Sequence, residues 1–274
     1  MKADRRRPAG LGKKPDVVWL PTPEKVVDAM LHLANAGPAD VLYDLGSGDG
    51  RTAIAAAARF GVREAKGVEV RPHLLRRSRD QARRAGVKDR VRFVGGDLFR
   101  ADLAGATVVT LYLLPRLNRK LRPRLLSELR PGTRIVSHDF GMDDWKPDRT
   151  LEVRDLFGGR EGFRVDHRLH LWVVPADAGG RWRLQGPNGE EFEMELVRRF
   201  QKVHGTLLFD GGRVPLRKAK LRGDSLSFAV RGVPGLGEKA RFEGRVEGDG
   251  MSGSFSGAGD GWTAGRVARQ AKSG

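Results

Sequence analysis

An aspartate that ends an apolar run is followed closely by three glycines in the first fifth of the chain. An apolar run around Asp44 leads directly into Gly46, Gly48 and Gly50, with Ser47 between the first two glycines. This pattern predicts a buried strand, a tight turn and the start of a helix, because glycine tolerates positive φ and lets a ligand approach the main chain closely. The chemistry that it indicates is the binding of a nucleotide-like cofactor.

The spacing of these glycines argues against a dinucleotide. The fingerprint G-x-G-x-x-G requires its third glycine at the position where this chain has Arg51. The carboxylate of Asp44 also stands at the end of the expected strand, where it suits an ammonium and a sulfonium better than a pyrophosphate. S-adenosylmethionine carries both of these cations, and we therefore expect it as the cofactor.

Two further acids stand at the ends of later strands. Glu69 ends the second expected strand, where its carboxylate could accept both ribose hydroxyls. Asp97 follows the third and could reach the adenine amino group, with Leu98 against the ring. Simpler roles are open for each acid: Asp44 could cap a turn, Glu69 could pair with Arg71, and Asp97 could form an Asx-turn. Taken together, in this order, the three acids favour a cofactor site.

An alternating α/β chain must position these acids. Strands are expected at residues 40–45, 64–70, 90–94, 107–112, 133–139, 150–156 and 164–174. Helices are expected at residues 51–60, 72–86 and 116–129. Before them, Thr22 is expected to cap a helix whose first residue is Pro23. The alternation predicts an α/β fold, a Rossmann-like doubly wound domain.

The last hundred residues show a different pattern, with glycine at short intervals. Phe192, Met194 and Leu196 alternate with glutamates, which is strand periodicity. Residues 221–228 and 246–255 resemble two hairpins that each turn at Gly-Asp. About seven or eight strands are expected, in a small all-β barrel or sandwich that is either filled by its own side chains or holds a ligand.

The chain is therefore expected to divide into three parts. These are a basic, flexible arm at residues 1–16, the α/β domain with its N-terminal helix at residues 17–175, and a β-rich, barrel-like domain at residues 176–274. The arm contains no apolar core of a signal peptide, and the chain has no run of 18 apolar residues. A cytoplasmic protein without membrane insertion is expected.

Composition limits the possible partners. The chain has no cysteine, and its six histidines show no ligand-like spacing, so that no metal is expected. The net charge of +17 raises the attraction for nucleic acid, acidic proteins and anionic membranes. The arginines are spread along the chain and do not form one stripe, which is also typical of a bias in nucleotide composition. Nucleic acid is therefore a possible partner but not the favoured one.

Six segments carry a resemblance to a known family. They are Trp19–Pro23, Asp44–Arg51, Gly67–Glu69, Gly96–Phe99, Thr107–Pro115, and Ser137–Phe140 with Trp145 and Pro147. These segments resemble one group of class I methyltransferases, which contains the archaeal broad-specificity protein-lysine methyltransferases and is similar to the lysine methyltransferases of the ATP synthase c-subunit. The resemblance implies a methyltransferase domain that uses S-adenosylmethionine and acts on an accessible lysine of a protein. It does not extend to the last hundred residues.

The resemblance also implies where the methyl acceptor binds. Tyr112 and Pro115, after the fourth strand, are the expected catalytic residues, and Leu114, Phe140 and Trp145 are expected to bind the substrate. Related amine and base methyltransferases carry Asp/Asn-Pro-Pro-aromatic at this position, and its absence here disfavours methylation of adenine or cytosine.

Several roles are left open. Thr22 is either the helix cap or a contact to the cofactor or the acceptor, and His138 and Asp139 end the fifth strand, where they could take a proton. Methylation of RNA or of a small amine is one alternative function. A non-catalytic protein that binds a ligand in the C-terminal barrel is the other.

Overall fold

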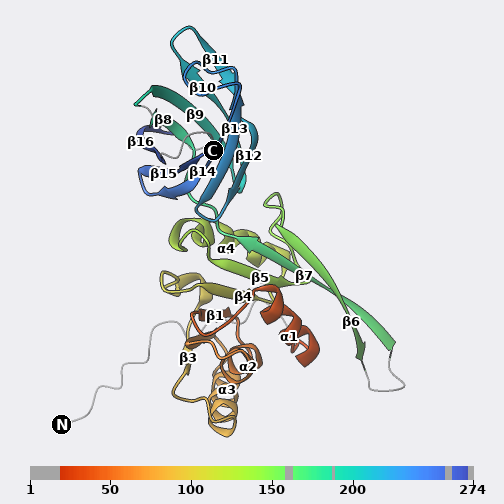
Figure 1. Ribbon diagram of the computed structural model, residues 1–274. Helices are drawn as coiled ribbons and strands as arrows, with labels where there is room; N and C mark the ends of the chain where they lie inside the picture. The colour runs from red at the N-terminus through yellow and green to blue at the C-terminus, as the bar shows by residue number, and fades with distance from the viewer. Residues whose placement is uncertain (1–18, 158–162, 187–188, 257–260, 271–274) are drawn as a thin grey trace, which may run out of the picture. The chain divides into compact units, whose positions relative to one another are not determined.

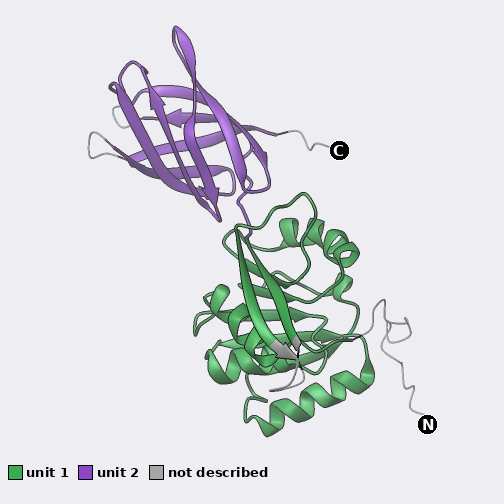
Figure 2. Cartoon of the chain, turned by 90° about the vertical axis from the view of Figure 1, so that its right-hand side faces the viewer, with its two compact units in different colours: residues 1–172 green, residues 173–274 purple. Residues whose placement is uncertain are grey.

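The computed structural model describes residues 19–157, 163–186, 189–256 and 261–270 (Figure 1). The chain divides into two compact units, residues 1–172 and residues 173–274 (Figure 2). The arm expected at residues 1–16 lies outside the described residues.

The first unit is built on a seven-stranded sheet with the order β3-β2-β1-β4-β5-β7-β6. Its strands are β1 (Val41–Leu45), β2 (Glu64–Glu69), β3 (Val91–Gly95), β4 (Val108–Leu111), β5 (Arg134–His138), β6 (Arg149–Phe157) and β7 (Phe163–Val173). Its helices are α1 (Glu24–Leu33), α2 (Arg51–Arg59), α3 (Pro72–Arg84), the short 3₁₀ helix η1 (Leu98–Arg100) and α4 (Pro115–Glu128). Each strand and helix that the alternation predicted in this unit is present, with bounds within two residues of the prediction. The Rossmann-like fold is confirmed.

The topology of this sheet creates a crevice at one edge. Strand β1 pairs in parallel with β2 on one side and with β4 on the other, and β3 and β5 continue the parallel sheet outward. The chain therefore changes direction across the sheet between β1 and β4. In open α/β sheets, ligands bind outside the carboxyl ends of the strands at such a switch point.

The predicted cap of the first helix is wrong. Pro23, not Thr22, occupies the cap position, and its side chain makes no capping hydrogen bond. The Pro23 backbone has φ −58° and ψ 148°, which is extended and not helical, so that the helix begins at Glu24. The Pro23 carbonyl accepts the amide protons of Val26 and Val27. The side chain of Thr22 is thereby released for another contact.

The second unit is a nine-stranded antiparallel sheet with the order β11-β10-β9-β8-β16-β15-β14-β13-β12. The strands are β8 (Gly180–Gln185), β9 (Glu191–Arg199), β10 (Lys202–Phe209), β11 (Gly212–Pro215), β12 (Arg217–Arg222), β13 (Ser225–Arg231), β14 (Lys239–Glu247), β15 (Gly250–Phe255) and β16 (Gly261–Arg269). The sheet curls until β10 contacts β12, which makes it barrel-like. Both predicted Gly-Asp turns are present, after β12 and after β14.

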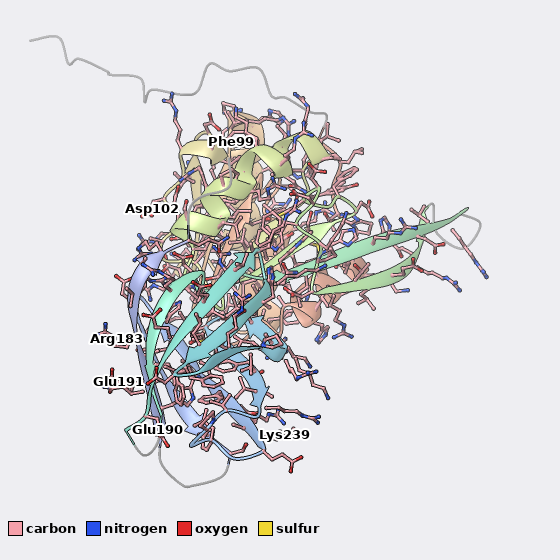
Figure 3. All side chains as sticks on the ribbon, turned by 90° about the horizontal axis from the view of Figure 1, so that it is seen from above. Phe99, Asp102, Arg183, Glu190, Glu191 and Lys239 are labelled. Atoms are coloured by element: carbon pink, nitrogen blue, oxygen red, sulfur yellow. The ribbon has the colours of Figure 1, made fainter. Side chains whose placement is uncertain are left out.

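The strand count exceeds the expected seven or eight. Strand β11 has only four residues and none of them is buried, so its sequence shows no alternation that could reveal it. Elsewhere the alternation is clear: charged side chains such as Arg183 and Glu191 are exposed and point away from the interior (Figure 3). The inward positions hold four large aromatic side chains, all at most 2% exposed: Trp182, Phe228, Phe242 and Trp262. Side chains of the unit's own strands therefore occupy its interior.

One buried cation fastens this unit. The side chain of Arg266 is 3% exposed and lies over the ring of Trp182, 4.0 Å from the ring centroid. It donates to the carboxylate of Asp249 at 2.7 Å and to the carbonyls of Asp177 and Gly179, both at 2.5 Å. A buried guanidinium is costly without its acceptors, and the buried carbonyls are costly without their donor. Loss of either side should therefore lower the stability of this unit.

We expect Arg266→Leu to destabilise the second unit by about 3 kcal/mol, since the carbonyls lose their donors while an apolar side chain still covers the ring. Hydrogen exchange of the β8 and β16 amides in the full chain measures the change. The matched control is Arg241→Leu, which breaks an exposed pair with Glu243 at 2.8 Å and should cost less than about 1 kcal/mol. Equal effects of the two substitutions would contradict the assignment.

Candidate active site

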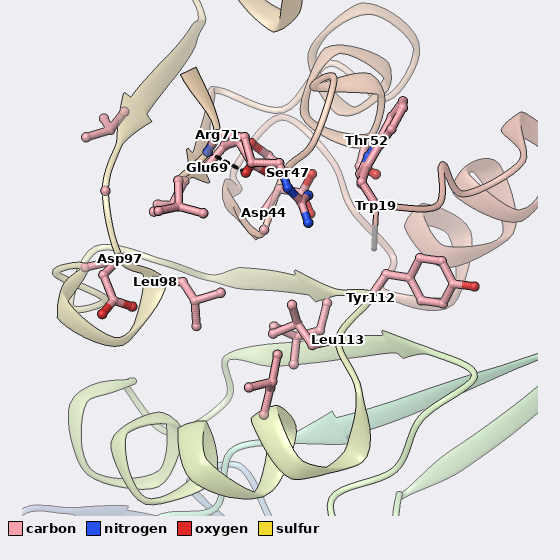
Figure 4. A pocket seen from close by; sticks show the side chains of 18 of the residues that line it. Trp19, Asp44, Ser47, Thr52, Glu69, Arg71, Asp97, Leu98, Tyr112 and Leu113 are labelled. Atoms are coloured by element: carbon pink, nitrogen blue, oxygen red, sulfur yellow. Dashed lines mark hydrogen bonds between the residues drawn. The ribbon is translucent and has the colours of Figure 1, made fainter. Parts of the chain in front are cut away.

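A cavity of about 810 Å³ opens at the carboxyl ends of β1 to β4 (Figure 4). Its size falls within the range of small-molecule and cofactor sites. Ten of the residues that the sequence predicted for the site line it, namely Thr22, Asp44, Gly46, Ser47, Glu69, Asp97, Leu98, Tyr112, Leu114 and Phe140. The parallel sheet explains this convergence, because it brings the ends of separate strands to one edge.

Asp44 is a buried acid on the wall of the cavity. One carboxylate oxygen accepts the hydroxyl of Thr110 at 2.8 Å. Burial raises the pKa of Asp44 to about 7; Thr110 opposes this shift, and the negative charges of Glu69 and Asp49 add to it. A cation bound beside this carboxyl would lower its pKa again, because the cation favours the ionised form.

The carboxylate of Glu69 is fixed by the main chain. One oxygen accepts the Gly48 amide at 2.9 Å and the other accepts the Arg71 amide at 2.8 Å, and the residue is only 3% exposed. The pairing with Arg71 that the sequence left open is therefore real, but it uses the backbone amide. Each carboxylate oxygen has a second lone pair, so the group can still accept two hydroxyls from a bound ligand.

Gly48 and Gly50 do not line the cavity but shape the loop beneath it. Gly48 has φ +56°, and a Cβ at this position would lie 2.2 Å from Nε1 of Trp19. Gly50 has φ +85° and stands at the cap of α2, where a Cβ would lie 2.4 Å from Phe93. Only glycine meets both demands, so these two residues act by positioning the Glu69 carboxylate and the helix start.

Asp97 forms the predicted Asx-turn and also lines the cavity, while its contact with adenine stays a prediction. It lines the cavity beside Leu98, and one oxygen accepts the amide of Phe99 at 2.9 Å, which caps η1. The Asx-turn thus holds the carboxylate at the rim of the cavity. Figure 4 shows Asp97 and Leu98 at the end opposite to Tyr112.

The other end of the cavity is aromatic. The ring of Tyr112 stacks on His138 with 3.9 Å between centroids and lies nearly parallel to Phe140 at 6.1 Å. Burial raises the pKa of the Tyr112 hydroxyl, and the charge of Asp139 raises it further. Tyr112 is therefore a neutral phenol at physiological pH. Leu114 completes this end and is 37% exposed.

Two predicted residues lie elsewhere. Pro115 is the first residue of α4 and is exposed, and it is absent from the described residues that line the cavity. Trp145 is completely buried and packs against Trp172 at 6.0 Å, while its carbonyl accepts the Trp172 indole N–H at 2.9 Å. The structure thus gives Trp145 a place in the interior and gives Pro115 a place at the start of a helix.

The lining residues that the sequence analysis did not assign to the site include Trp19, Asp49 and Arg51. Arg51 pairs with Asp49 at 2.7 Å and donates to the Thr22 carbonyl at 2.9 Å, so it ties the segment before α1 to the glycine loop. Although burial raises the pKa of Asp49, the hydrogen bonds and charge of Arg51 outweigh it, and the pKa is lowered. The sequence feature that could have drawn attention to Arg51 is its place where the dinucleotide fingerprint requires a third glycine.

A second group lies behind Tyr112 and joins His138 and Asp139 to a residue that the sequence analysis did not single out, His167. Side-chain atoms of His138, Asp139 and His167 lie within 4.8 Å of one another, although His167 comes from a different strand. The scattered histidines of the sequence gave no sign of this grouping. The expectation that no metal is bound stays a prediction.

Together the fold and the cavity define a class of protein. The buried acid Asp44 can pair with a cation, and the fixed carboxylate of Glu69 can accept two hydroxyls of a diol. Asp97 and Leu98 close the far end of the cavity. These features fit S-adenosylmethionine, whose ammonium, ribose and adenine need such partners in this order along the sheet. The chain is a Rossmann-like methyltransferase.

Comparison with known proteins gives the family. The model of the ANTKMT methyltransferase domain matches residues 44–149. A protein-lysine N-methyltransferase of Saccharolobus islandicus is 41% identical over 160 residues, which are 58% of this chain and 95% of that protein. The lysine N-methyltransferase of the ATP synthase c-subunit from Mus musculus is 38% identical over 127 residues, which are 46% of this chain and 49% of the mouse protein.

A solved structure is also similar. It is an RNA methyltransferase from Salinibacter ruber in complex with S-adenosyl-L-homocysteine, with 51% identity and a TM-score of 0.51, covering 57% of this chain and 94% of that one. This chain belongs to the family of S-adenosylmethionine-dependent methyltransferases that includes the Saccharolobus islandicus protein, as the resemblance in the sequence predicted. Within the described residues, no helix is long and apolar enough to cross a membrane.

Proposed function

We propose that this enzyme transfers methyl groups to lysine side chains of proteins. The observation that carries the proposal is the similarity to a protein-lysine N-methyltransferase along 95% of that protein's length. The acceptor end of the cavity supports it. Tyr112, Leu114 and Phe140 form an apolar and aromatic wall there. The segment that begins at Tyr112 lacks the acidic or amide residue that related base methyltransferases carry.

S-adenosylmethionine supplies a methyl group bound to a positively charged sulfur. The acceptor amine attacks the methyl carbon in line with the S–C bond, and the sulfur leaves. The enzyme must therefore hold a neutral amine about 3 Å from the methyl carbon. An ordinary lysine has a pKa of about 10.4, so its deprotonation at pH 7 costs about 4.6 kcal/mol. Burial against Tyr112 and Phe140 lowers this cost, because it disfavours the ammonium. No covalent nucleophile is needed.

The proposal is tested with the purified protein, S-adenosylmethionine labelled on its methyl group, and a cell lysate separated into protein, RNA and small-molecule fractions. We expect label in the protein fraction, recovered as methyl-lysine after hydrolysis. Acetylation of the lysate amines should remove it, and so should Glu69→Ala in the enzyme. Label confined to RNA or to small amines would overturn the proposal.

Methylation of RNA is the second candidate function. The similar solved structure from Salinibacter ruber is that of an RNA methyltransferase, and a net charge of +17 favours binding to phosphates. The missing Asp/Asn-Pro-Pro-aromatic segment argues against transfer to a base nitrogen. RNA labelling that falls steeply with salt would favour this function over the first.

The proposed domain boundary has a test of its own. We propose that residues 1–175 fold and bind the cofactor without the β-rich domain, because every described residue that lines the cavity lies in the first unit. Calorimetry with S-adenosylhomocysteine should give the same affinity for the truncated and the full chain. A folded truncation that fails to bind would contradict the boundary. Membership of an enzyme family argues against the alternative of a non-catalytic barrel protein, and the cytoplasmic location stays a prediction.

A further inference from the structure

A line of polar side chains leads from the acceptor end of the cavity into the protein. The hydroxyl of Thr22, which lines the cavity, lies 3.3 Å from Nδ1 of His138. His138 is completely buried, and its other ring nitrogen, Nε2, lies 2.9 Å from Nδ1 of His167. The three side chains come from the segment before α1, from the end of β5 and from β7, so the fold must assemble them.

Asp139 connects this line to solvent. One of its carboxylate oxygens lies 3.3 Å from Nε2 of His138 and 3.8 Å from Nδ1 of His167, and its side chain is 30% exposed. Asp139 has φ +59°, which is unfavourable for a residue with a Cβ. Two hydrogen bonds with the Arg168 backbone hold Asp139 there. The Asp139 amide donates to the Arg168 carbonyl at 2.6 Å, and the Asp139 carboxylate accepts the Arg168 amide at 2.9 Å. The position of this carboxylate is therefore imposed by the structure.

His138 is neutral in the resting enzyme. Burial lowers the pKa of His138 to about 4; the charge of Asp139 opposes this shift and His167 adds to it. The titratable groups that face it are Tyr112 directly after β4, Asp139 directly after β5 and His167 on β7. His170, further along β7, is held neutral by burial, which lowers its pKa. A neutral imidazole has one bare nitrogen, which can accept a proton from Thr22.

We propose that Thr22, His138, His167 and Asp139 form a relay that carries the proton of the acceptor ammonium to solvent. The inference rests on the proposed lysine substrate. The ammonium gives its proton to the Thr22 oxygen as the Thr22 hydroxyl proton moves to Nδ1 of His138. The Nε2 proton of His138 moves at the same time to Nδ1 of His167. The proton then leaves through the exposed carboxylate of Asp139.

The bonds and protons of this relay balance. The acceptor loses one proton and keeps the electron pair that forms the new N–C bond, while the S–C bond breaks and its pair returns to sulfur. Because one proton arrives at His138 as another leaves, the buried imidazolium that its environment disfavours never has to persist. The charge ends beside the carboxylate of Asp139. Exchange with water after product release restores the starting tautomer.

The sharpest test compares two substitutions at one position. Thr22→Val is nearly isosteric but has no hydroxyl, whereas Thr22→Ser keeps it. With the protein fraction of the lysate as acceptor and saturating cofactor, we expect Thr22→Val and His138→Asn to slow single-turnover methyl transfer about 100-fold at pH 7. The loss should shrink toward pH 10, where free amine becomes abundant. Thr22→Ser should recover most of the rate that Thr22→Val loses, and the exposed control His73→Asn should retain the wild-type rate.

The outcomes separate the two levels of the proposal. Affinity for S-adenosylhomocysteine, measured by calorimetry, shows that each variant is folded. Unchanged rates and pH profiles in Thr22→Val and Asp139→Asn, with a wild type that labels protein, overturn the relay alone. A wild type that labels no protein overturns the proposed function and the relay with it. A stoichiometric metal in the purified enzyme that is lost in His167→Asn also overturns the relay.

Discussion

Glu69→Ala should lose nearly all affinity for S-adenosylmethionine and its demethylated product. The carboxylate accepts the amides of Gly48 and Arg71, and its remaining lone pairs are the proposed partners of the ribose hydroxyls. Hydrogen bonds to a charged group are worth about 1.5–3 kcal/mol each, so the loss of two such bonds predicts an affinity at least about 150-fold lower. Calorimetric titration with S-adenosylhomocysteine measures it.

The control for this prediction lies on the same strand. Glu64 begins β2 and is exposed, so Glu64→Ala should leave the affinity unchanged. Glu69→Gln keeps one acceptor oxygen and should fall between the two. If Glu69→Ala stays folded and binds within about threefold of the wild type, this carboxylate does not hold the ligand, because even one charged hydrogen bond is worth more.

The sequence predicted the cofactor end of the cavity well because its causes are local. A glycine loop after a buried strand, and an acid at the end of each following strand, can be recognised one segment at a time. A parallel sheet then brings Asp44, Glu69 and Asp97 to the same edge whatever the details of packing. The hydrogen bond from the Gly48 amide to Glu69 also depends on this geometry, but the spacing of the two residues in the sequence does not predict it.

The acceptor end was harder because its residues meet through distant parts of the chain. His167 reaches His138 only because β7 takes its place next to β5, and Thr22 reaches it only because Pro23 displaced the expected helix cap. Trp145 belongs to a conspicuous segment, yet its large ring is buried against Trp172. Motif membership shows that a residue matters, but it does not distinguish packing from contact with a ligand.

The second unit shows the same limit in another form. Alternation revealed strands such as β9, in which every second residue from Phe192 to Leu196 is buried. It could not reveal β11, whose residues are not buried. Nor does alternation indicate what fills a barrel: only the packing of Phe228 on Phe242, 4.7 Å apart and nearly parallel, shows that aromatic side chains occupy the interior.

Cofactor binding should depend on pH through Asp44. Burial raises the pKa of this carboxyl to about 7, so in the free enzyme it is mostly protonated below pH 7, whereas the proposed contact to the ligand ammonium needs the ionised form. The affinity should therefore rise with pH, by about fifteenfold between pH 5.5 and pH 7, because only the ionised fraction binds. Binding at pH 5.5 should also release nearly one proton.

Calorimetry in buffers of different ionisation enthalpy measures that proton directly, since the observed heat then changes with the buffer. Asp44→Asn keeps the size of the side chain and a carbonyl acceptor for the Thr110 hydroxyl, but it cannot ionise. Its affinity should be about tenfold lower than that of the wild type at pH 7, corresponding to a charged hydrogen bond, and should be flat from pH 5.5 to pH 7. A wild-type affinity that is equally flat, with no proton released, would mean that the ligand ammonium does not meet this carboxylate and that the raised pKa of Asp44 only reflects its burial.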